Sequence, residues 1–239
     1  MSARPALTRE RIVEAAVTVA DRGGLASVSM RSVGREVGAE AMSLYHHLRG
    51  KEELLDALAD WAFSRIRLPR PDQPWRVAMR TRAASARAVL FAHPWALGLL
   101  ESRRHPGPAL LHHHDAVIGC LRDAGFPVRL AAHAYSVLDA YVYGFVLTEL
   151  NLPMEAGEDA QEFAEGLALA AADYPHLVEM MTEQIAGGTY DYADEFDYGL
   201  DLVLDGLEER LARVADERVA DAGHGRQGDG PSATARVDG

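Results

Sequence analysis

The stretch that most constrains the fold covers residues 29–51 and reads SMRSVGREVGAEAMSLYHHLRGK. Two short amphipathic segments, residues 30–37 and 40–48, are separated by Gly38, a residue type that tolerates the positive φ of a helix C-terminus. Ser29 precedes the first segment, where a side-chain oxygen can cap free N–H groups. Because each segment has one apolar stripe, the pair predicts a helix-turn-helix.

The second segment has an inner and an outer face. Leu44 and Leu48 share the inner face, and Val33 and Val37 share the matching face of the first segment. The outer face mixes methyl, hydroxyl and ring-nitrogen groups, which can contact thymine methyls, base edges and phosphates. We expect a DNA-binding surface made by Ala41, Met42, Ser43, Tyr45, His46 and His47. A helix-turn-helix that binds a protein is the alternative.

Charge is divided unevenly along the chain. The formal net charge is −12, but residues 1–51 carry eight basic and five acidic side chains, so this part is +3 and the rest is −15. Such asymmetry orients the N-terminal part toward DNA. Lys51, the only lysine, opens the next expected helix, where the dipole and free N–H groups favour a phosphate. Arg31 can pair with guanine through two hydrogen bonds.

Helical spacing continues along the whole chain, and no alternating pattern predicts strands. A first helix from Thr8 to Gly23-Gly24 completes a three-helix helix-turn-helix domain at residues 1–50. A connecting helix at 51–68 ends where three prolines follow, at Pro69, Pro71 and Pro74. We therefore predict an all-α protein whose second domain, residues 74–214, has helices at about 75–92, 94–102, 108–124, 127–151, 160–172, 174–186 and 192–214.

Residues 215–239 are rich in Gly, Asp and Ala and poor in large apolar residues, which predicts a disordered tail. The single cysteine, Cys120, excludes a disulfide framework and favours a reducing compartment. Early charges at Arg4 and Arg9 argue against a signal peptide. The longest apolar stretch, residues 130–148, contains Asp139 and is expected to be a core helix rather than a membrane span. We expect a cytoplasmic protein.

Other chemistry is weakly supported by the sequence. The histidines His105, His112, His113 and His114 suggest a metal site, although adjacent helical residues point about 100° apart and cannot easily share one ion. No G-x-S-x-G or glycine-rich phosphate loop occurs, so we expect neither an enzyme nor a bound cofactor. The acidic residues at 191–201 are interpreted as a helix N-terminus with a solvated face.

Three motifs in the first part resemble the tetracycline-repressor (TetR) family. They are Val28-Ser29-Met30-Arg31, then residues 41–47 reading AMSLYHH, then Lys51-Glu52-Glu53-Leu54-Leu55. The resemblance implies that Tyr45 and Lys51 contact phosphates, which leaves base reading to Arg31, Ala41, Met42, Ser43 and His46. His47 would either bind a phosphate or cap the helix.

The second domain resembles the tetracycline-repressor type at residues 134–147 and 196–208. The resemblance implies that these two helices pair with those of a second subunit, with Gly144, Gly199 and Gly206 allowing close approach. It also implies a small-molecule effector cavity lined by His93, Trp95, Arg104, Tyr135, Tyr141 and Glu149. Arg67, Leu100 and Thr148 replace residues that hold tetracycline and magnesium, so that effector is not expected.

Together these features predict a homodimeric transcriptional regulator, a repressor that binds a palindromic operator in double-stranded DNA and is released by a small-molecule effector. Two alternatives stay open. One is a metal-sensing regulator that uses His105 and residues 112–114. The other is a ligand carrier or enzyme that keeps the fold without regulating DNA.

Overall fold

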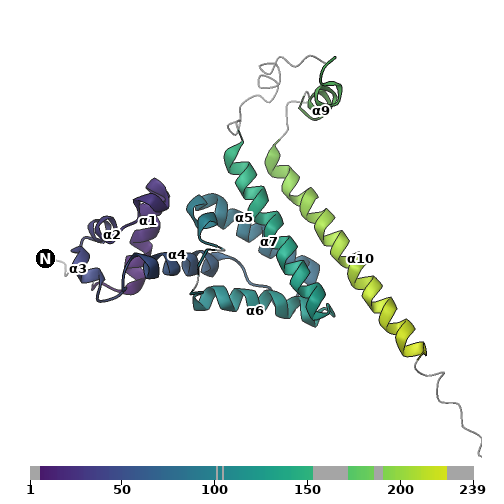
Figure 1. Cartoon of the computed structure of the whole chain (residues 1–239), viewed down its shortest axis with the longest axis horizontal. Helices are drawn as coiled ribbons and strands as arrows, with labels where there is room; N and C mark the ends of the chain where they lie inside the picture. Colours follow the sequence, from purple (N-terminus) through teal and green to yellow (C-terminus); the bar gives the residue numbers. More distant parts are fainter. Residues whose placement is uncertain (1–5, 101, 104, 153–171, 186–190, 225–239) are drawn as a thin grey trace, which may run out of the picture.

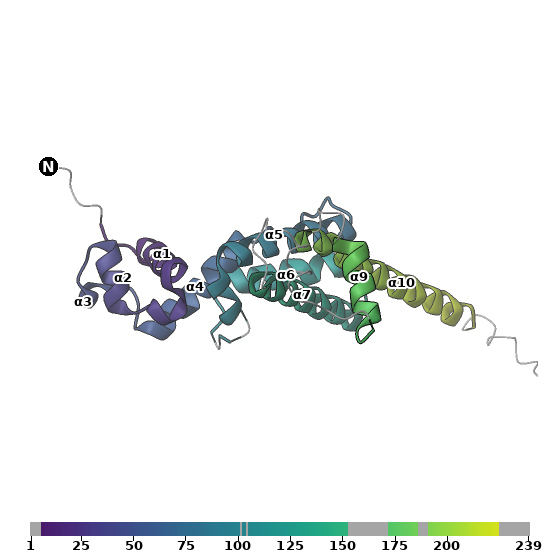
Figure 2. The same cartoon turned by 90° about the horizontal axis from the view of Figure 1, so that it is seen from above.

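The computed structural model describes residues 6–100, 102–103, 105–152, 172–185 and 191–224, with the backbone alone for residues 219–224. Within these ranges the chain forms helices and no strand, which confirms the expected all-α class. Figure 1 and Figure 2 show a small head of short helices at one end, joined by α4 to a larger helical body.

The head contains α1 (Arg9–Ser27), α2 (Met30–Val37) and α3 (Ala41–Leu44). Gly23 and Gly24 have non-helical φ/ψ angles inside α1, so the chain kinks at the expected break. Ser29 caps α2 as predicted, and its partner is Ser32. The Ser29 hydroxyl accepts from the Ser32 amide at 3.1 Å, and the Ser32 hydroxyl accepts from the Ser29 amide at 2.9 Å.

The helix expected over residues 40–48 is shorter than predicted. Helix α3 ends at Leu44, and the amides of Tyr45 and His47 bond to carbonyls three residues back, at 3.3 and 2.9 Å. This tighter winding turns the chain toward α4 while both Leu44 and Leu48 stay buried, at 0% and 1% exposure. Leu44 and Leu48 therefore form a buried apolar stripe as predicted, although the α-helix ends at the first of them.

Gly38 takes a left-handed conformation with φ of 73°, as expected at the end of α2. Gly34 is a second constraint that the pattern did not indicate. A Cβ at Gly34 would lie 2.9 Å from the carbonyl oxygen of Ala39 and 3.2 Å from the amide nitrogen of Ala41. The turn between α2 and α3 is therefore packed directly against the backbone of α2.

Helix α4 (Lys51–Arg65) carries the chain from the head to α5 (Trp75–Ala92). It packs on both α1 and α6 (Pro108–Asp123), and it buries Leu54, Leu58 and Phe63. The helix expected over residues 94–102 is instead a short 3₁₀ segment, η1 (Pro94–Gly98), whose tight turn places Trp95 in the core.

The centre of the body is α7 (Val128–Asn151), which packs on α5, α6 and α10. By length and composition α7 could cross a membrane, but its buried side chains, including Leu138, Val142 and Val146, face the neighbouring helices. Helix α9 (Pro175–Ile185) and the 3₁₀ segment η2 (Tyr192–Asp194) precede α10. The helix expected over residues 160–172 lies outside the described residues.

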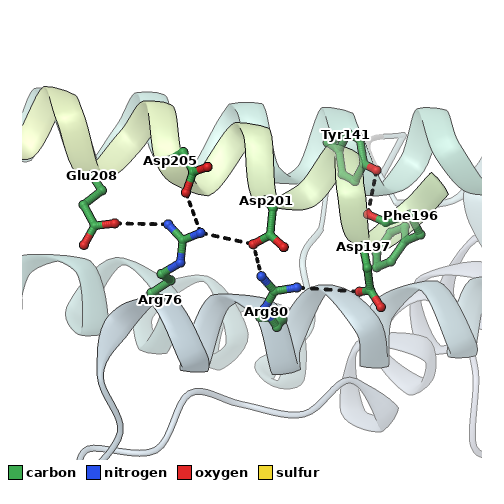
Figure 3. A network of polar contacts seen from close by, with 8 residues as sticks. All are labelled: Arg76, Arg80, Tyr141, Phe196, Asp197, Asp201, Asp205 and Glu208. Atoms are coloured by element: carbon green, nitrogen blue, oxygen red, sulfur yellow. Dashed lines mark hydrogen bonds and ion pairs between the residues drawn. The ribbon is translucent and has the colours of Figure 1, made fainter. Parts of the chain in front are cut away.

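Helix α10 (Glu195–His224) runs past residue 214, into the segment expected to be disordered. Its first half is bound to α5 by an ion-pair network, shown in Figure 3. Arg76 contacts Asp205 at 2.6 Å, Asp201 at 3.1 Å and Glu208 at 3.2 Å, and Arg80 contacts Asp201 as well. The acidic residues at 191–201 were interpreted as a helix N-terminus with a solvated face; the side chains of Asp197 and Asp201 are 75% and 43% exposed, and they also pair with Arg80 of α5.

Candidate DNA-binding surface and ligand region

The expected DNA-binding side chains lie on the outside of the head. Met42 is 72% exposed and Tyr45 is 48% exposed, whereas Leu44 between them is buried. Arg31, His46 and Lys51 are also exposed, and Ala41, Ser43 and His47 are partly exposed. The structure therefore keeps the inner and outer faces separate, as the sequence predicted.

Lys51 is the first residue of α4, and the N-cap, Gly50, offers no side-chain cap to the free amides of this helix. The carboxylate of Glu53 accepts from the Arg49 amide at 2.8 Å and from the Arg9 guanidinium at 2.5 Å, and these bonds lower the pKa of Glu53. Arg9 also donates to the carbonyl of His47 at 3.2 Å. Arg9 of α1 therefore helps to fix the segment that precedes Lys51. This contact could not be predicted from residue patterns.

The head contacts the body through Asp21 of α1. Its Oδ1 accepts from the indole Nε1 of Trp95 at 2.6 Å and lies 2.7 Å from Nδ1 of His93. The Trp61 ring of α4 packs edge-on against the His93 ring, with centroids 4.9 Å apart. His93 and Trp95 were expected to line the effector cavity, but the structure places them in this head–body joint.

A second joint holds α4 to the chain that precedes α6. Arg103 donates to Asp56 at 2.6 Å and to Glu52 at 2.8 Å. The carboxylate of Asp60 accepts from the Leu110 amide at 3.0 Å. Glu52, Asp56 and Asp60 all lie on α4, so these contacts join the body to the helix that begins with Lys51.

Among the other expected effector residues that the structure describes, Tyr141 and Glu149 adjoin one cluster of Arg87, Phe145 and Phe196, whereas Tyr135 lies beside Arg82. Tyr141 donates to the carbonyl of Phe196 at 2.8 Å and joins α7 to α10, as Figure 3 shows. Glu149 pairs with Arg87, whose guanidinium lies over the Phe145 ring. Arg104 lies outside the described residues. Of the expected effector residues within the described ranges, Tyr135 is the one that adjoins the buried polar groups of the body.

These buried groups meet where α5, α6 and α7 pack together. Arg82, His113 and Asp139 are 1%, 0% and 4% exposed. Arg82 donates through Nη2 to Asp139 and through Nε to Nε2 of His113 at 3.2 Å, and Tyr143 donates to Asp139 at 3.3 Å. Burial, and then the Arg82 charge, lower the pKa of His113 to about 3.

Arg82 was not predicted as a site residue, although its position in the sequence carried a signal. It follows Met79 by three residues and precedes Ala83 and Ala86, so it falls on the apolar face of α5. A cation at such a position is buried only with partners. Its partners come from two helices distant in the sequence, and periodicity within one helix cannot reveal them.

The histidines considered for metal binding occupy different environments. His112 is exposed, His113 is buried, and His114 is partly buried beside the Tyr135 and Phe63 rings. His105 is 87% exposed at its side chain and lies near Asp56. Within the part of the chain that the structure describes, no three His, Cys, Asp or Glu side chains gather as metal ligands. No observation there favours the metal-sensing alternative.

Two family models match the chain. Residues 12–58 match that of the bacterial regulatory proteins of the tetR family, and residues 68–211 match that of the tetracyclin repressor-like C-terminal domain. These spans correspond to the head with most of α4, and to the body.

Similar proteins and solved structures point to the same family as the two family models. The HTH-type transcriptional repressor DrrR1 of Streptomyces coeruleorubidus is 33% identical, over 88% of this chain and 80% of that protein. The class C tetracycline repressor protein of Escherichia coli is 30% identical, over 89% and 96%. The crystal structure of ActR from Streptomyces coelicolor with actinorhodin has a TM-score of 0.71 and 27% identity, over 87% and 99%. The chain therefore belongs to the TetR family and is a ligand-responsive, DNA-binding transcriptional repressor, not an enzyme.

Proposed function

We propose that this repressor works in the cytoplasm as a homodimer that binds a palindromic operator and leaves it when a small-molecule effector binds the body. The observation that carries the proposal is the outward face of the head, where Arg31, Met42, Tyr45, His46 and Lys51 are all exposed. Tyr45 and Lys51 would contact phosphates and set the register, while Arg31, Ala41, Met42, Ser43 and His46 would meet base edges and His47 the backbone.

A second subunit is supported by the outer face of α7 and α10, which lie side by side (Figure 1). Val137 and Leu147 on α7 are 43% and 57% exposed, and Tyr198 and Leu202 on α10 are 67% and 59% exposed. Large apolar side chains gathered on adjacent helices are typical of an interface. Two heads related by a two-fold axis would read two half-sites about one helical turn apart.

Release by an effector is supported by the two joints between head and body. Helix α4 begins at Lys51, is bound through Asp56 to Arg103, and packs its Phe63 ring 5.2 Å from the ring of His113. A ligand in the body that shifts α6 would therefore shift α4 and change the separation of the two heads. ActR, the similar protein, has been crystallised with actinorhodin, which fits a body that binds organic ligands.

The test combines two measurements. The first is which part of the DNA next to the gene that encodes this chain the protein protects, and the second is the mass of the protein in solution. We expect two symmetrical protected half-sites and a particle of twice 26.0 kDa. Protection of a single half-site by a monomer would overturn the dimer. Absence of any protection, with a folded dimer present, would overturn the operator assignment at that locus.

A further inference from the structure

The C-terminal half of α1 is attached to the body directly, without passing through α4. Asp21 Oδ1 accepts from Trp95 Nε1 at 2.6 Å and lies 2.7 Å from Nδ1 of His93. Four residues further along the chain, the Leu25 side chain reaches the backbone of η1, since a Cβ built on Gly98 would lie 3.6 Å from its Cδ1. The head is therefore joined to the body at a second place, in addition to the helix that links them.

Another carboxylate of α1 binds α4 instead of the body. Glu14 accepts from the indole nitrogen of Trp61 and from the guanidinium of Arg65, both at 3.0 Å. Trp61 and Arg65 belong to α4, so Glu14 makes the head move together with that helix. Such a contact cannot hold the head against the body when α4 tilts. The Asp21 contact can, because its partners lie on η1 and at the end of α5.

Breaking the Asp21 contact is costly. Trp95 is 7% exposed, and its N–H has no other acceptor among the described residues. A buried donor that loses its acceptor and finds no water in its place carries the full desolvation penalty. The His93 ring also contacts the rings of Trp61 and Trp95, with centroids 4.9 and 5.9 Å away. A head that turned away from η1 would therefore leave an unpaired indole and disturb these ring contacts.

The angle of each head on its body matters for reading two half-sites. In a two-fold dimer this angle fixes both the distance and the rotation between the two recognition surfaces. One inserted base pair moves a half-site by about 3.4 Å along the duplex and turns it by about 34° around the axis. A firmly held head fits one spacing, whereas a loosely held head can follow several.

We propose that the hydrogen bond between Asp21 and Trp95 selects the spacing of the two operator half-sites, so that Asp21 determines DNA specificity although it faces the body. The inference rests on the proposed binding of a palindromic operator by a homodimer, and it adds the contact that sets the spacing. Asp21 acts through the position of the head and is therefore a positioning residue.

The first test uses the full-length protein and a set of duplexes that carry the same two half-sites with the central spacer lengthened or shortened by one base pair. Fluorescence anisotropy gives the affinity for each duplex. To reach a changed spacing the wild type must break the bond between Asp21 and Trp95. Its affinity should therefore fall at least about tenfold, the loss that one broken buried hydrogen bond causes.

Three variants and one control separate this role from general stability. Asp21→Ala removes the acceptor and Trp95→Phe removes the donor, so in both the changed spacing should lower affinity by less than about threefold. Asp21→Asn keeps an oxygen acceptor for the indole and should retain the wild-type preference. Arg22→Ala is the matched control, since its neighbouring side chain pairs with Glu36 inside the head at 2.9 Å and should leave the preference unchanged. All proteins are measured below their unfolding temperatures.

The second test requires neither DNA nor a dimer. Spin labels are attached at Glu40→Cys on the head and Arg129→Cys on α7, two exposed positions, in protein that also carries Cys120→Ala. Pulsed electron paramagnetic resonance on labelled protein diluted with unlabelled protein gives the distribution of head–body distances. The distribution should be narrow when residue 21 is Asp or Asn, and broader in Asp21→Ala and Trp95→Phe.

A wild-type spacing preference that Asp21→Ala and Trp95→Phe leave intact would overturn the proposal. Equal widths of the distance distributions in all variants would overturn it as well. If the wild type binds no palindromic duplex, the proposed operator fails and the selection of spacing fails with it. Distances that broaden in the two variants would in that case still identify Asp21 as the residue that holds the head, so the two failures are distinguishable.

Discussion

Asp21 of α1 accepts a hydrogen bond from the indole nitrogen of Trp95 at 2.6 Å, which ties the DNA-binding head to the ligand-binding body. The same oxygen lies 2.7 Å from the ring of His93. Trp95 is 7% exposed, so its N–H has little access to water. The orientation of the head is therefore set in part by one carboxylate, in addition to α4.

Asp21→Ala should destabilise the protein by about 1–2 kcal/mol, because the buried Trp95 N–H loses its acceptor. Thermal unfolding should show a midpoint lower by a few degrees, about 2–4 °C per kcal/mol. Asp72→Ala is the control, since Asp72 pairs with Arg70 in an exposed loop and should leave the unfolding midpoint unchanged. Equal shifts in the two variants would show that the joint contributes nothing.

Lys51→Ala should weaken operator binding uniformly across related sequences, because a phosphate contact carries no base information. In a dimer two contacts are lost, so the slope of log K against log salt should become shallower by about 1.8. Fluorescence anisotropy over a salt series measures both quantities. Arg213→Ala, an exposed charge on α10 far from the head in the sequence, should leave the slope unchanged. A changed base preference with an unchanged slope would argue against the phosphate role.

Gly34→Ala should abolish operator binding and destabilise the head by about 1–3 kcal/mol, because the added Cβ would overlap the backbone of Ala39 and force α2 and α3 apart. Gly119→Ala offers the matched helical control. A Cβ at Gly119 meets nothing within 4 Å, so the protein should gain up to about 1 kcal/mol from helix propensity. Chemical denaturation and DNA retardation measure the pair, and normal binding by Gly34→Ala would refute this account of the turn.

Leu202→Glu should convert the dimer to monomers, because it places a charge in the apolar face of α7 and α10. Light scattering after size exclusion would then give the mass of one chain instead of two. Leu111→Glu on α6 is the control, with a similarly exposed leucine outside that face. If Leu111→Glu dissociates the protein and Leu202→Glu does not, the interface lies elsewhere.

The free energy of unfolding should fall as the pH falls from about 6.5 toward 3. In this range His113 binds a proton in the unfolded chain but stays neutral in the folded protein, where its pKa is lowered. In this window the unfolded chain binds more protons, so the free energy of unfolding rises with pH. His113→Gln should remove about 1.4 kcal/mol per pH unit from that slope. His112→Gln, at the exposed neighbour, should leave the slope as in the wild type. Denaturant unfolding at several pH values measures the difference, and parallel slopes for wild type and His113→Gln would contradict a buried neutral ring.

Much of the head could be predicted from local chemistry. Ser29 and Gly38 specify where α2 begins and ends, because a hydroxyl caps free amides and glycine tolerates positive φ. Leu44 and Leu48 fix which side faces the core. The length of α3 was overestimated, because the turn that follows it is set by packing of the chain into α4, not by the propensity of residues 45–48.

The contacts of the expected effector residues could not be predicted from local patterns, since they join residues far apart in the sequence. The resemblance implied that His93 and Trp95 line the effector cavity, and the structure shows that Asp21 contacts both at the joint between head and body. The sequence by itself determined the helical class, the two-part organisation and the outward face of the head, because capping and periodicity act within a few residues. Only the tertiary structure decided that Arg82, His113 and Asp139 meet, because burying a charge requires partners that three separate helices supply together.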